Sequence, residues 1–492
     1  MSDARQDGGD GRHTPYDLPL GEWLIGTLAD DWDPEQSVAH PAVPGAAEAA
    51  ARHRAAVSGR FPGQALVIPA GESPVRANDT RYAFRPSSAY AYLTSDYAEH
   101  GVLLLTPAAH GHDAVLFLPE RIGPGAAEYF TDRRRGAVWV GGVPDAETTS
   151  AQIDLPVRPL GDLASALATL DGRPCLLRGV DAGVDMLLPG ATDGGLAQVI
   201  DELRAIKDGW EIDRMAEACA ATARGFADVV RAIPGLLAAG GRRGERWLEG
   251  TFWRRARYEG NEVGYSSVVA AGTHATSLHW APVDGDIVAG QLLLADMGVE
   301  TTSLYTADIT RTLPVSGQWT PEQRRVYQAV YEANRAGIAE VRAGNPYLAA
   351  HHAAQWVLAD HLWHWGVIPY KPADALHDDP ARPGANAHRR YTLHGTSHML
   401  GIDVHDCAAL TPGQYVHQDL RPGHCLTVEP GLYFQVNDRT VPAGLRGLAV
   451  RVEDDVLVTG REPRVLSAAL PVHPDELTAW MNDIQATPEV LP

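Results

Sequence analysis

Two aspartates interrupt a stretch that otherwise predicts buried β-strands, and this stretch constrains the fold more than any other. Residues 292–313 read LLLADMGVETTSLYTADITRTL and include Asp296 and Asp308. The run 292–295 has no polar alternation, which is typical of a strand covered on both faces. An ionised carboxylate at the end of such a strand is costly unless a cation or good hydrogen-bond donors compensate its charge.

The segment between the two aspartates favours a hairpin that brings them together. Residues 298–303 are polar enough to form its turn. Two strands folded back on each other would place the carboxylates side by side, where a bound cation lets both stay charged. The alternative is that one aspartate ends a strand and the other caps a turn, because Asp is common at such positions.

Length and charge narrow the class of protein. A chain of 492 residues exceeds the size at which a single core usually keeps growing, so we expect two domains. The 41 Lys+Arg against 62 Asp+Glu give a formal net charge of -21, which argues against nucleic acid or an anionic membrane as a partner.

The apolar runs are too short to span a bilayer and the polar N-terminus lacks a signal-peptide core, so we expect a cytoplasmic protein. The 4 cysteines are widely spaced, lack a CxxC pair and suit reduced core residues.

The order of predicted elements divides the chain into four parts. Residues 1–45 have no sustained period, and we expect an arm that is mobile or forms an interface. Residues 46–192 alternate short apolar runs with turn signals, which predicts an α/β layer domain. Residues 193–475 combine long helical periods with strands and carry the clustered chemistry, and residues 476–492 are expected to form a C-terminal tail.

Four helices packed on a strongly bent sheet are expected in the second half. Helical spacing covers the ranges 210–233, 245–258, 320–341 and 347–365. Pro234 and Gly235 would end the first of these helices. A loop at 272–280 carries two histidines. The strand-like segments near the C-terminus are 392–403, 424–434 and 448–459.

Three further segments embed charged or imidazole groups in strand-like sequence. HGTSHMLGIDVHD at 394–406 holds three histidines, LTVEPGLYF holds Glu429, and VRVEDDVLVT holds Glu453. One such glutamate alone would more often be a salt-bridge partner. Four embedded acids with a histidine point instead to one oxygen-rich dinuclear metal site. Two divalent cations would balance the four negative charges, lower the pKa of a bridging water and polarise a carbonyl, as hydrolases require.

The ligand chemistry also narrows the choice of metal. Ligation dominated by carboxylates, with one imidazole, suits two Mn²⁺ ions. Zn²⁺, Co²⁺ and Fe²⁺ are the alternatives, because affinity alone does not select among these metals.

The ordered set of embedded groups resembles the metal-binding motif of the pita-bread metallopeptidases. The members of the set are Asp296, Asp308, His398, Glu429 and Glu453. The strings HGTSHMLGIDVHD, LTVEPGLYF and VRVEDDVLVT look most like the aminopeptidase P (Xaa-Pro aminopeptidase) family, and the similarity extends over roughly residues 46–470. The resemblance implies an α/β (α+β) fold in which a creatinase-like N-terminal domain precedes a pita-bread catalytic domain.

The resemblance also implies a role for each ligand. Asp296 would bind one metal only. Asp308 and Glu453 would bridge both metals. His398 and Glu429 would complete the second metal, and Glu429 would take the proton from the hydroxide that bridges the pair.

Further residues match family positions around the metals. His279 and His405 match outer histidines that orient the scissile carbonyl and stabilise the tetrahedral intermediate. His394 matches another histidine that lines the substrate pocket. Arg451 matches an arginine that steadies a ligand carboxylate, and Tyr433 matches a tyrosine near the site.

The implied activity is the metal-dependent release of the N-terminal residue from peptides that carry proline in second position. A prolidase, which cleaves only Xaa-Pro dipeptides, is the nearest alternative. A non-catalytic pita-bread protein that binds peptides is another alternative, although the complete ligand set counts against it. Creatinase-type relatives work without metal but lack this ligand set. For assembly, the resemblance implies a homodimer or a homotetramer.

Overall fold

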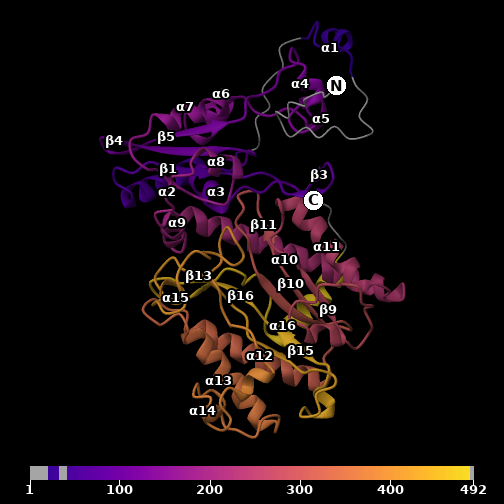
Figure 1. The fold of residues 1–492 in the computed structure, drawn as a ribbon. Helices are drawn as coiled ribbons and strands as arrows, with labels where there is room; N and C mark the ends of the chain where they lie inside the picture. Colours follow the sequence, from indigo (N-terminus) through magenta and orange to yellow (C-terminus); the bar gives the residue numbers. More distant parts are fainter. Residues whose placement is uncertain (1–19, 33–41, 488–492) are drawn as a thin grey trace, which may run out of the picture. The chain divides into compact units, whose positions relative to one another are not determined.

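The computed structural model describes residues 20–32 and 42–487, which form two compact units. The first unit ends at Ile200 and the second begins at Asp201. Figure 1 colours the strands of the first unit in purple and those of the second from rose to yellow. None of the described helices combines the length and the apolar content that a membrane span requires.

The first unit is built on a five-stranded sheet with the order β6-β5-β4-β1-β7. β1 pairs antiparallel with β4, and β4 with β5, whereas β6 and β7 run parallel to their neighbours. These strands are β1 (Leu66–Pro69), β4 (Val102–Ala108), β5 (Gly111–Leu118), β6 (Val157–Pro159) and β7 (Cys175–Leu176). A separate hairpin consists of β2 (Val75–Ala77) and β3 (Thr80–Arg81).

Helices cover both faces of this sheet. Figure 1 shows α6 and α7 on one side of the sheet and α2 and α3 on the other. The helical elements of the unit are α1 (Glu22–Leu28), α2 (Ala46–Arg60), α3 (Ser88–Thr94), α4 (Glu128–Thr131), α5 (Ala137–Val140), α6 (Ala146–Ile153), η1 (Leu160–Asp162), α7 (Leu163–Ala168), α8 (Ala182–Leu187) and the start of α9 (Leu196–Arg204). The predicted α/β layer domain is therefore confirmed.

Short antiparallel sheets form the centre of the second unit. Two of them have three strands, in the orders β12-β10-β9 and β13-β16-β17, and β14-β15 and β11-β8 are strand pairs. The strands are β8 (Glu262–Val263), β9 (Val268–Ala271), β10 (Leu292–Met297), β11 (Val299–Glu300), β12 (Ile309–Pro314), β13 (Cys425–Val428), β14 (Gly431–Tyr433), β15 (Ala449–Arg451), β16 (Asp454–Leu457) and β17 (Arg464–Val465). β10 and β12 pair antiparallel, which confirms the predicted return of the chain between the two aspartates.

Two pairs of long helices pack on these sheets, as the helical periods predict. They are α10 (Gly209–Ala238) with α11 (Gly244–Glu259), and α12 (Pro321–Ala339) with α13 (Ala349–His364). The largest hydrophobic cluster joins the inner faces of all four helices to the sheets, for example through Phe226, Phe252, Tyr327, Leu358 and Leu293. Burial of these faces provides the main favourable free energy for folding of the unit.

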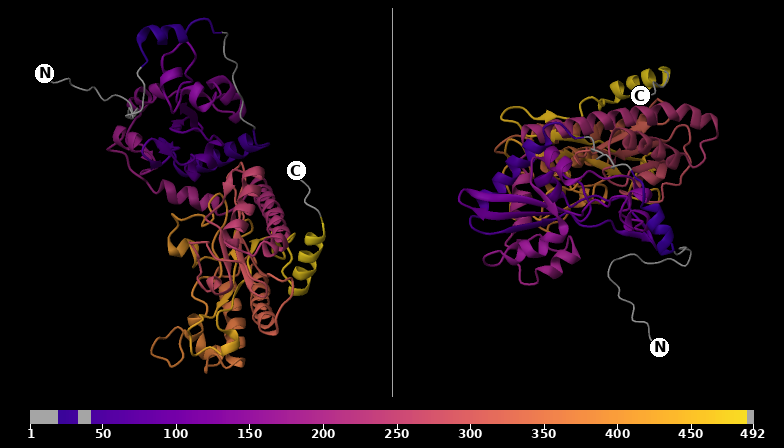
Figure 2. Two further views of the ribbon diagram at one scale, coloured as in Figure 1. Left: turned by 90° about the vertical axis from the view of Figure 1, so that its right-hand side faces the viewer. Right: turned by 90° about the horizontal axis from the view of Figure 1, so that it is seen from above.

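Shorter helical elements complete the second unit. They are η2 (Gly272–Thr276), α14 (Pro372–Ala375), η3 (Ala387–Arg390), α15 (Pro412–Tyr415), η4 (Ala443–Leu445) and α16 (Pro474–Ala486). Figure 2 shows α16, in yellow, beside the long α10. Leu477 and Met481 of α16 are buried in the main core, so this part of the expected tail belongs to the second unit.

One predicted helix end is wrong. α10 continues through Pro234 to Ala238, although Pro234 cannot donate a hydrogen bond to the carbonyl of Val230. The side-chain amide of Gln485, on α16, donates to that carbonyl at 3.3 Å. The neighbouring helix thus satisfies the backbone group that proline leaves free, and the helix persists.

One predicted strand is also wrong. Between 392 and 403 the chain forms only an isolated bridge, from Met399 to Leu426, and otherwise turns. The amide of Gly401 donates to the carbonyl of Asp403, which folds the segment back on itself. The apolar side chains predicted a strand here, but their burial is achieved in a loop.

The cysteines agree with the expected reduced core. All four are free and buried: Cys175, Cys219, Cys407 and Cys425. Parts of the expected arm and tail, at 1–19, 33–41 and 488–492, lie outside the described residues.

The contact between α10 and α11 gives a test of the packing. A Cβ on Gly225 would lie 2.5 Å from ring carbons of Phe252, whereas nothing lies within 4 Å of a Cβ on Gly250. Overpacking costs about 1–3 kcal/mol, and alanine in a helix regains only about 1 kcal/mol over glycine. We expect Gly225→Ala to lower the free energy of unfolding by about 1–2 kcal/mol in urea denaturation.

The control is Gly250→Ala on the exposed face of α11. It should raise the free energy of unfolding by about 0.5–1 kcal/mol, because only the helix propensity changes. Equal gains in both variants would show that the two helices do not pack as described.

Candidate metal centre

The hairpin of β10 and β12 carries the two aspartates that the sequence singled out. Asp296 lies on β10 opposite Thr310, and Asp308 directly precedes β12. Both residues are buried. The backbone N–H of Asp308 donates to the carboxylate of Asp455 at 3.1 Å, which fixes the chain at the start of β12.

The two glutamates lie where two other strand pairs end. Glu429 follows β13 and Glu453 precedes β16. The residues next to them, Val428 and Asp454, are paired between these two antiparallel strands. The amide of Glu453 donates to the carbonyl of Thr310 at 3.1 Å. The side chain of Thr310 donates in turn to Glu453 Oε2 at 2.6 Å. The register of the sheets therefore brings Glu453 to the aspartate hairpin.

His398 completes the cluster. Its Nε2 lies 3.2 Å from Asp308 Oδ2 and 3.6 Å from Glu429 Oε1. Its Nδ1 lies 3.1 Å from the backbone carbonyl of Met399, an acceptor that directs Nε2 toward the carboxylates. Asp308, His398 and Glu453 each offer one ligand atom, and these atoms lie within 4.8 Å of one another.

Arg451 and the hydroxyl group of Tyr265 hold Asp296 in place. Arg451 Nη2 donates to Asp296 Oδ2, and Tyr265 donates to Asp296 Oδ1 at 2.6 Å. Arg451 also donates to Tyr433 at 3.0 Å and to Thr310 at 3.1 Å. Arg451 therefore lies beside the carboxylate of Asp296, and the hydrogen bonds restrict rotation of Asp296.

The charges in this cluster are poorly balanced by the protein alone. Burial, with the charges of Asp308 and Glu429, raises the pKa of Glu453 well above its usual range. Burial also raises the pKa of Asp296 to about 6, despite the opposing charge of Arg451. Burial opposes the charged form of His398, but its hydrogen bond to Asp308 and the nearby carboxylates raise the pKa of that histidine to about 9. A carboxylate-rich donor set strained in this way fits divalent cations, which would neutralise it.

The three outer histidines lie at different distances from this cluster. His394 has its Nδ1 3.4 Å from Glu429 Oε2 and its Nε2 2.9 Å from the hydroxyl of Tyr433. The ring centroid of His405 lies 4.5 Å from that of His398. Burial lowers the pKa of His405, and the charges of His398 and His279 lower it further. Leu278 and Trp280, the neighbours of His279 in sequence, pack against the apolar cluster that includes Tyr433, so the loop of His279 lies beside the pocket.

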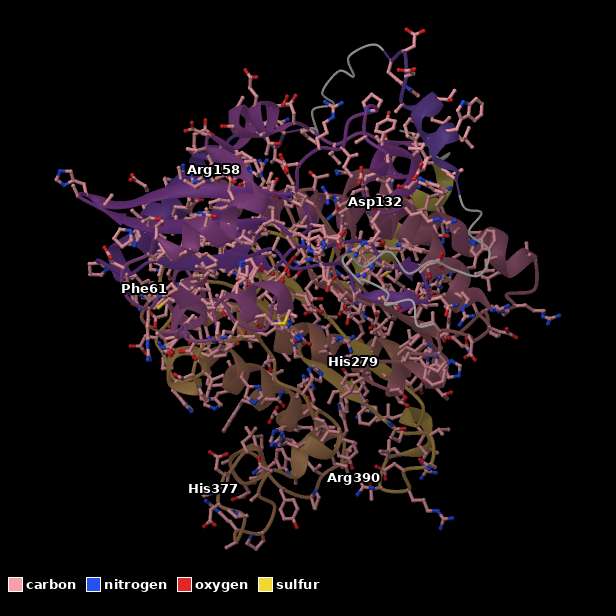
Figure 3. The ribbon with its side chains drawn as sticks, turned by 45° about the horizontal axis from the view of Figure 1, so that its top comes forward. Phe61, Asp132, Arg158, His279, His377 and Arg390 are labelled. Atoms are coloured by element: carbon pink, nitrogen blue, oxygen red, sulfur yellow. The ribbon has the colours of Figure 1, made fainter. Side chains whose placement is uncertain are left out.

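Figure 3 shows the side chain of His279 apart from His377 and Arg390, two other labelled residues of the second unit. His279 is exposed, in the loop that follows η2. An exposed imidazole beside a buried carboxylate cluster can reach a substrate from solvent. The structure thus places His394 and His405 beside the cluster of carboxylates and His398, and the loop of His279 beside Tyr433.

A buried ion network anchors the loop that carries His405. Asp406 accepts hydrogen bonds from Arg204 and, at 2.7 Å, from Lys207 Nζ. Arg204 also donates to Asp403 at 2.7 Å. Burial opposes ionisation of Asp406, but the charges of Arg204 and Lys207 lower its pKa to about 2. The side chains of Arg204 and Lys207 therefore keep Asp406 ionised and fix its position, directly after His405.

Two residues of the cluster escaped the sequence reasoning. Thr310 shares one face of β12 with Thr312, and the same alternation places Asp308 on that face, so the strand period could have identified it. Tyr265 precedes β9 in a loop, where nothing in the local pattern pointed to the cluster.

Comparison with known proteins identifies the family. Residues 213–460 match the model of metallopeptidase family M24, and residues 50–174 match the aminopeptidase P N-terminal domain. The chain belongs to metallopeptidase family M24 and has the two-domain fold of aminopeptidase P. The predicted creatinase-like and pita-bread architecture is therefore confirmed.

Particular relatives agree over most of the chain. Xaa-Pro aminopeptidase 1 of Streptomyces coelicolor is 46% identical over 440 residues, which cover 89% of this chain and 87% of that protein. Xaa-Pro aminopeptidase of Escherichia coli is 30% identical over 446 residues, covering 87% of this chain and 96% of that protein.

Solved structures show the same similarity. The structure of aminopeptidase P from E. coli with the inhibitor Pro-Leu matches with a TM-score of 0.78 at 25% identity, over 90% of this chain and 99% of that chain. Pseudomonas aeruginosa aminopeptidase PepP matches with a TM-score of 0.78 at 28% identity, over 91% of this chain and 100% of that chain.

The anchor of the His405 loop gives a pH-dependent prediction. Asp406→Asn removes the charge that Arg204 and Lys207 share, so we expect a loss of about 3 kcal/mol in the free energy of unfolding at pH 7. The lowered pKa of Asp406 stabilises the fold above pH of about 4, the pKa in the unfolded chain. That stabilisation disappears as the pH falls to about 2, so the difference between wild type and variant should shrink over this range.

Urea denaturation between pH 7 and pH 3 measures the difference. Asp475→Asn is the control, because Asp475 pairs with Arg324 at the surface and such pairs contribute at most about 1 kcal/mol. A variant difference that stays constant with pH would contradict the assigned pKa of Asp406.

Proposed function

We propose that this chain is an Xaa-Pro aminopeptidase, a metal-dependent hydrolase that removes the N-terminal residue from peptides with proline in second position. The observation that carries the proposal is the cluster of four carboxylates, three of them buried, with His398, and with His394 and His405 beside it. The relatives named Xaa-Pro aminopeptidase, matched over most of their length, support the substrate class.

We assign the ligands as follows. Asp308 and Glu453 would be shared by two divalent cations, as in the metal-binding motif that the ordered set resembles. Their carboxylates and His398 offer atoms within 4.8 Å of one another, which supports a common site. Asp296 would complete the coordination of one ion, and His398 with Glu429 would complete that of the other. Mn²⁺ suits this oxygen-rich set best, with Zn²⁺, Co²⁺ and Fe²⁺ as the alternatives. When bound, the cations would lower the pKa of a water molecule and polarise the scissile carbonyl.

Glu429 and the residues around the ligands would handle protons and orientation. We assign to Glu429 the acceptance of a proton from the attacking water. Burial opposes ionisation of Glu429, but His394, His398 and Arg451 lower its pKa to about 2. His279 and His405 would hydrogen-bond the oxygen of the tetrahedral intermediate. The proline nitrogen must leave protonated, so one of the rim histidines must also deliver a proton.

His394 and Tyr433 would shape the pocket around the substrate. They hydrogen-bond each other at 2.9 Å, and Arg451 donates to Tyr433. This chain of contacts connects the pocket wall to Asp296 through Arg451. A rigid wall of this kind holds the substrate in a reactive orientation.

We also propose a cytoplasmic homo-oligomer. The four free buried cysteines support a reducing compartment. Three aromatic side chains on α11, those of Trp247, Trp253 and Tyr258, are exposed, and such residues are enriched in subunit interfaces. The proposed state is a dimer or a tetramer, which light scattering distinguishes.

A substrate panel tests the proposed activity. We expect purified protein with Mn²⁺ to release the first residue from Gly-Pro-Gly and from a longer Xaa-Pro peptide, and to lose this activity when a chelator removes the metal. A matched Gly-Ala-Gly peptide controls for general aminopeptidase activity. Cleavage of the dipeptide Gly-Pro, added to the panel, without cleavage of the longer peptides would indicate a prolidase. An unchanged rate after chelation would contradict the metal-dependent mechanism.

Substitution of a shared ligand tests the assignment of the metals. Asp308→Ala or Glu453→Ala should abolish turnover of Xaa-Pro peptides and reduce the bound metal, because each variant loses a ligand common to both ions. His405→Ala should lower kcat by about 100-fold while the metal content, measured by mass spectrometry, stays near that of wild type.

If Asp308→Ala or Glu453→Ala kept a turnover near that of wild type, the assignment of that residue as a ligand of both ions would be wrong. Loss of metal in His405→Ala would contradict its position outside the metal ligands.

A further inference from the structure

A fully buried carboxylate outside the metal cluster has four donors. Glu245 lies in the first turn of α11 and its side chain is 0% exposed. The donors to it are Ala271 N at 2.8 Å, His274 Nδ1 at 2.8 Å, Trp280 Nε1 at 2.9 Å and Gly285 N at 2.6 Å. Each carboxylate oxygen accepts two of these bonds, so the buried charge is well compensated.

The four donors belong to a single stretch of chain. Ala271 ends β9, His274 lies in η2, and Trp280 and Gly285 belong to the loop that follows. His279 lies in this loop, directly before Trp280. One carboxylate thus binds the segment 271–285 on both sides of His279.

Close packing supports the same arrangement. The ring of His274 stacks on that of Trp280, with centroids 4.0 Å apart and an interplanar angle of 22°. A Cβ on Gly285 would lie 2.7 Å from Cδ of Glu245, so only glycine allows this approach. The amide of Glu245 also donates to the carbonyl of Gly285 at 3.1 Å.

A second contact fixes the loop from the side of the metal cluster. Gln435 donates through Nε2 to the carbonyl of Thr276 at 2.8 Å, and the Thr276 hydroxyl donates to Gln435 Oε1 at 3.1 Å. Gln435 follows β14 by two residues, and β14 contains Tyr433 of the pocket. The loop of His279 is therefore tied both to α11 and to the sheet that carries the site.

We propose that Glu245 is a positioning residue for peptide hydrolysis, because it clamps the segment 271–285 and so fixes His279 at the rim of the metal centre. The proposal rests on the proposed function, in which His279 stabilises the tetrahedral intermediate. Glu245 does not touch the substrate, and its effect on the reaction passes through His279. Transition-state groups must be held in place before the reaction to be effective.

Glu245→Gln gives the first test. The amide keeps the shape of the side chain but presents N–H groups to two of the four donors. We expect kcat for Gly-Pro-Gly to fall about 10-fold or more, with KM and the metal content within about 2-fold of wild type. Trp280→Phe removes one donor and keeps an aromatic ring beside His274, so a smaller fall in kcat is expected.

Asp228→Asn is the matched control. Asp228 is a buried carboxylate on α10 that accepts bonds from Arg231 and Arg255. Its substitution should lower the stability of the second unit but leave kcat within about 2-fold of wild type. A kcat loss in Asp228→Asn equal to that in Glu245→Gln would reduce the effect to general destabilisation and overturn the proposal.

A double-mutant cycle with His279→Ala separates positioning from structure. If Glu245 acts through His279, Glu245→Gln should cost little further kcat once His279 is absent. Losses that multiply would overturn the proposal. The wild-type rate in the same assay reports separately on the proposed aminopeptidase activity.

Hydrogen exchange tests the clamp without reference to activity. In Glu245→Gln, amide exchange within 272–285 should rise at least about 10-fold, while exchange in α12 stays unchanged. Unchanged exchange in 272–285 would overturn the clamp, whatever the turnover of the enzyme.

Discussion

Mutual repulsion among buried carboxylates is the constraint on which the second unit depends. Asp296, Asp308 and Glu453 are buried, the side chain of Glu429 is 17% exposed, and all four come from separate segments and converge beside His398. Four such charges cannot all remain ionised in a dry interior without cations, which is why the pKa of Glu453 lies far above its usual range. The pairing of the strands brings these carboxylates together although they repel one another. Bound divalent metal ions would turn this repulsion into net attraction.

Around the cluster, buried ion pairs and polar networks fix the segments that carry the proposed site residues. Arg451 holds Asp296, and Thr310 connects Arg451 to Glu453. Arg204 and Lys207 hold Asp406 next to His405, while Glu245 holds the loop of His279. Exposed side chains at the rim therefore rest on buried anchors. Such anchoring reduces the reorganisation that the transition state would otherwise require.

The sequence pointed to most residues of this cluster because they are charged groups within apolar segments. Asp296 and Glu453 stand out as charges within apolar strands, and the long helical periods predicted α10 to α13. The two wrong predictions, a helix end and a strand, concern segments whose structure depends on contacts with residues far away in the sequence. The rescue of Pro234 by Gln485 and the loop around Met399 follow from neighbours far away in the chain. Glu245 was read only as the start of a helix, because nothing local reveals that its four donors lie more than 25 positions further along.

The five proposed ligands should converge on a pair of divalent ions. A crystal structure of the protein soaked in Mn²⁺, with diffraction recorded at the manganese absorption edge, tests this arrangement most directly. We expect two anomalous peaks, both in contact with the carboxylates of Asp308 and Glu453, one near Asp296 and the other near His398 and Glu429. A single peak away from Asp308 and Glu453, or no peak at saturating Mn²⁺, would contradict it.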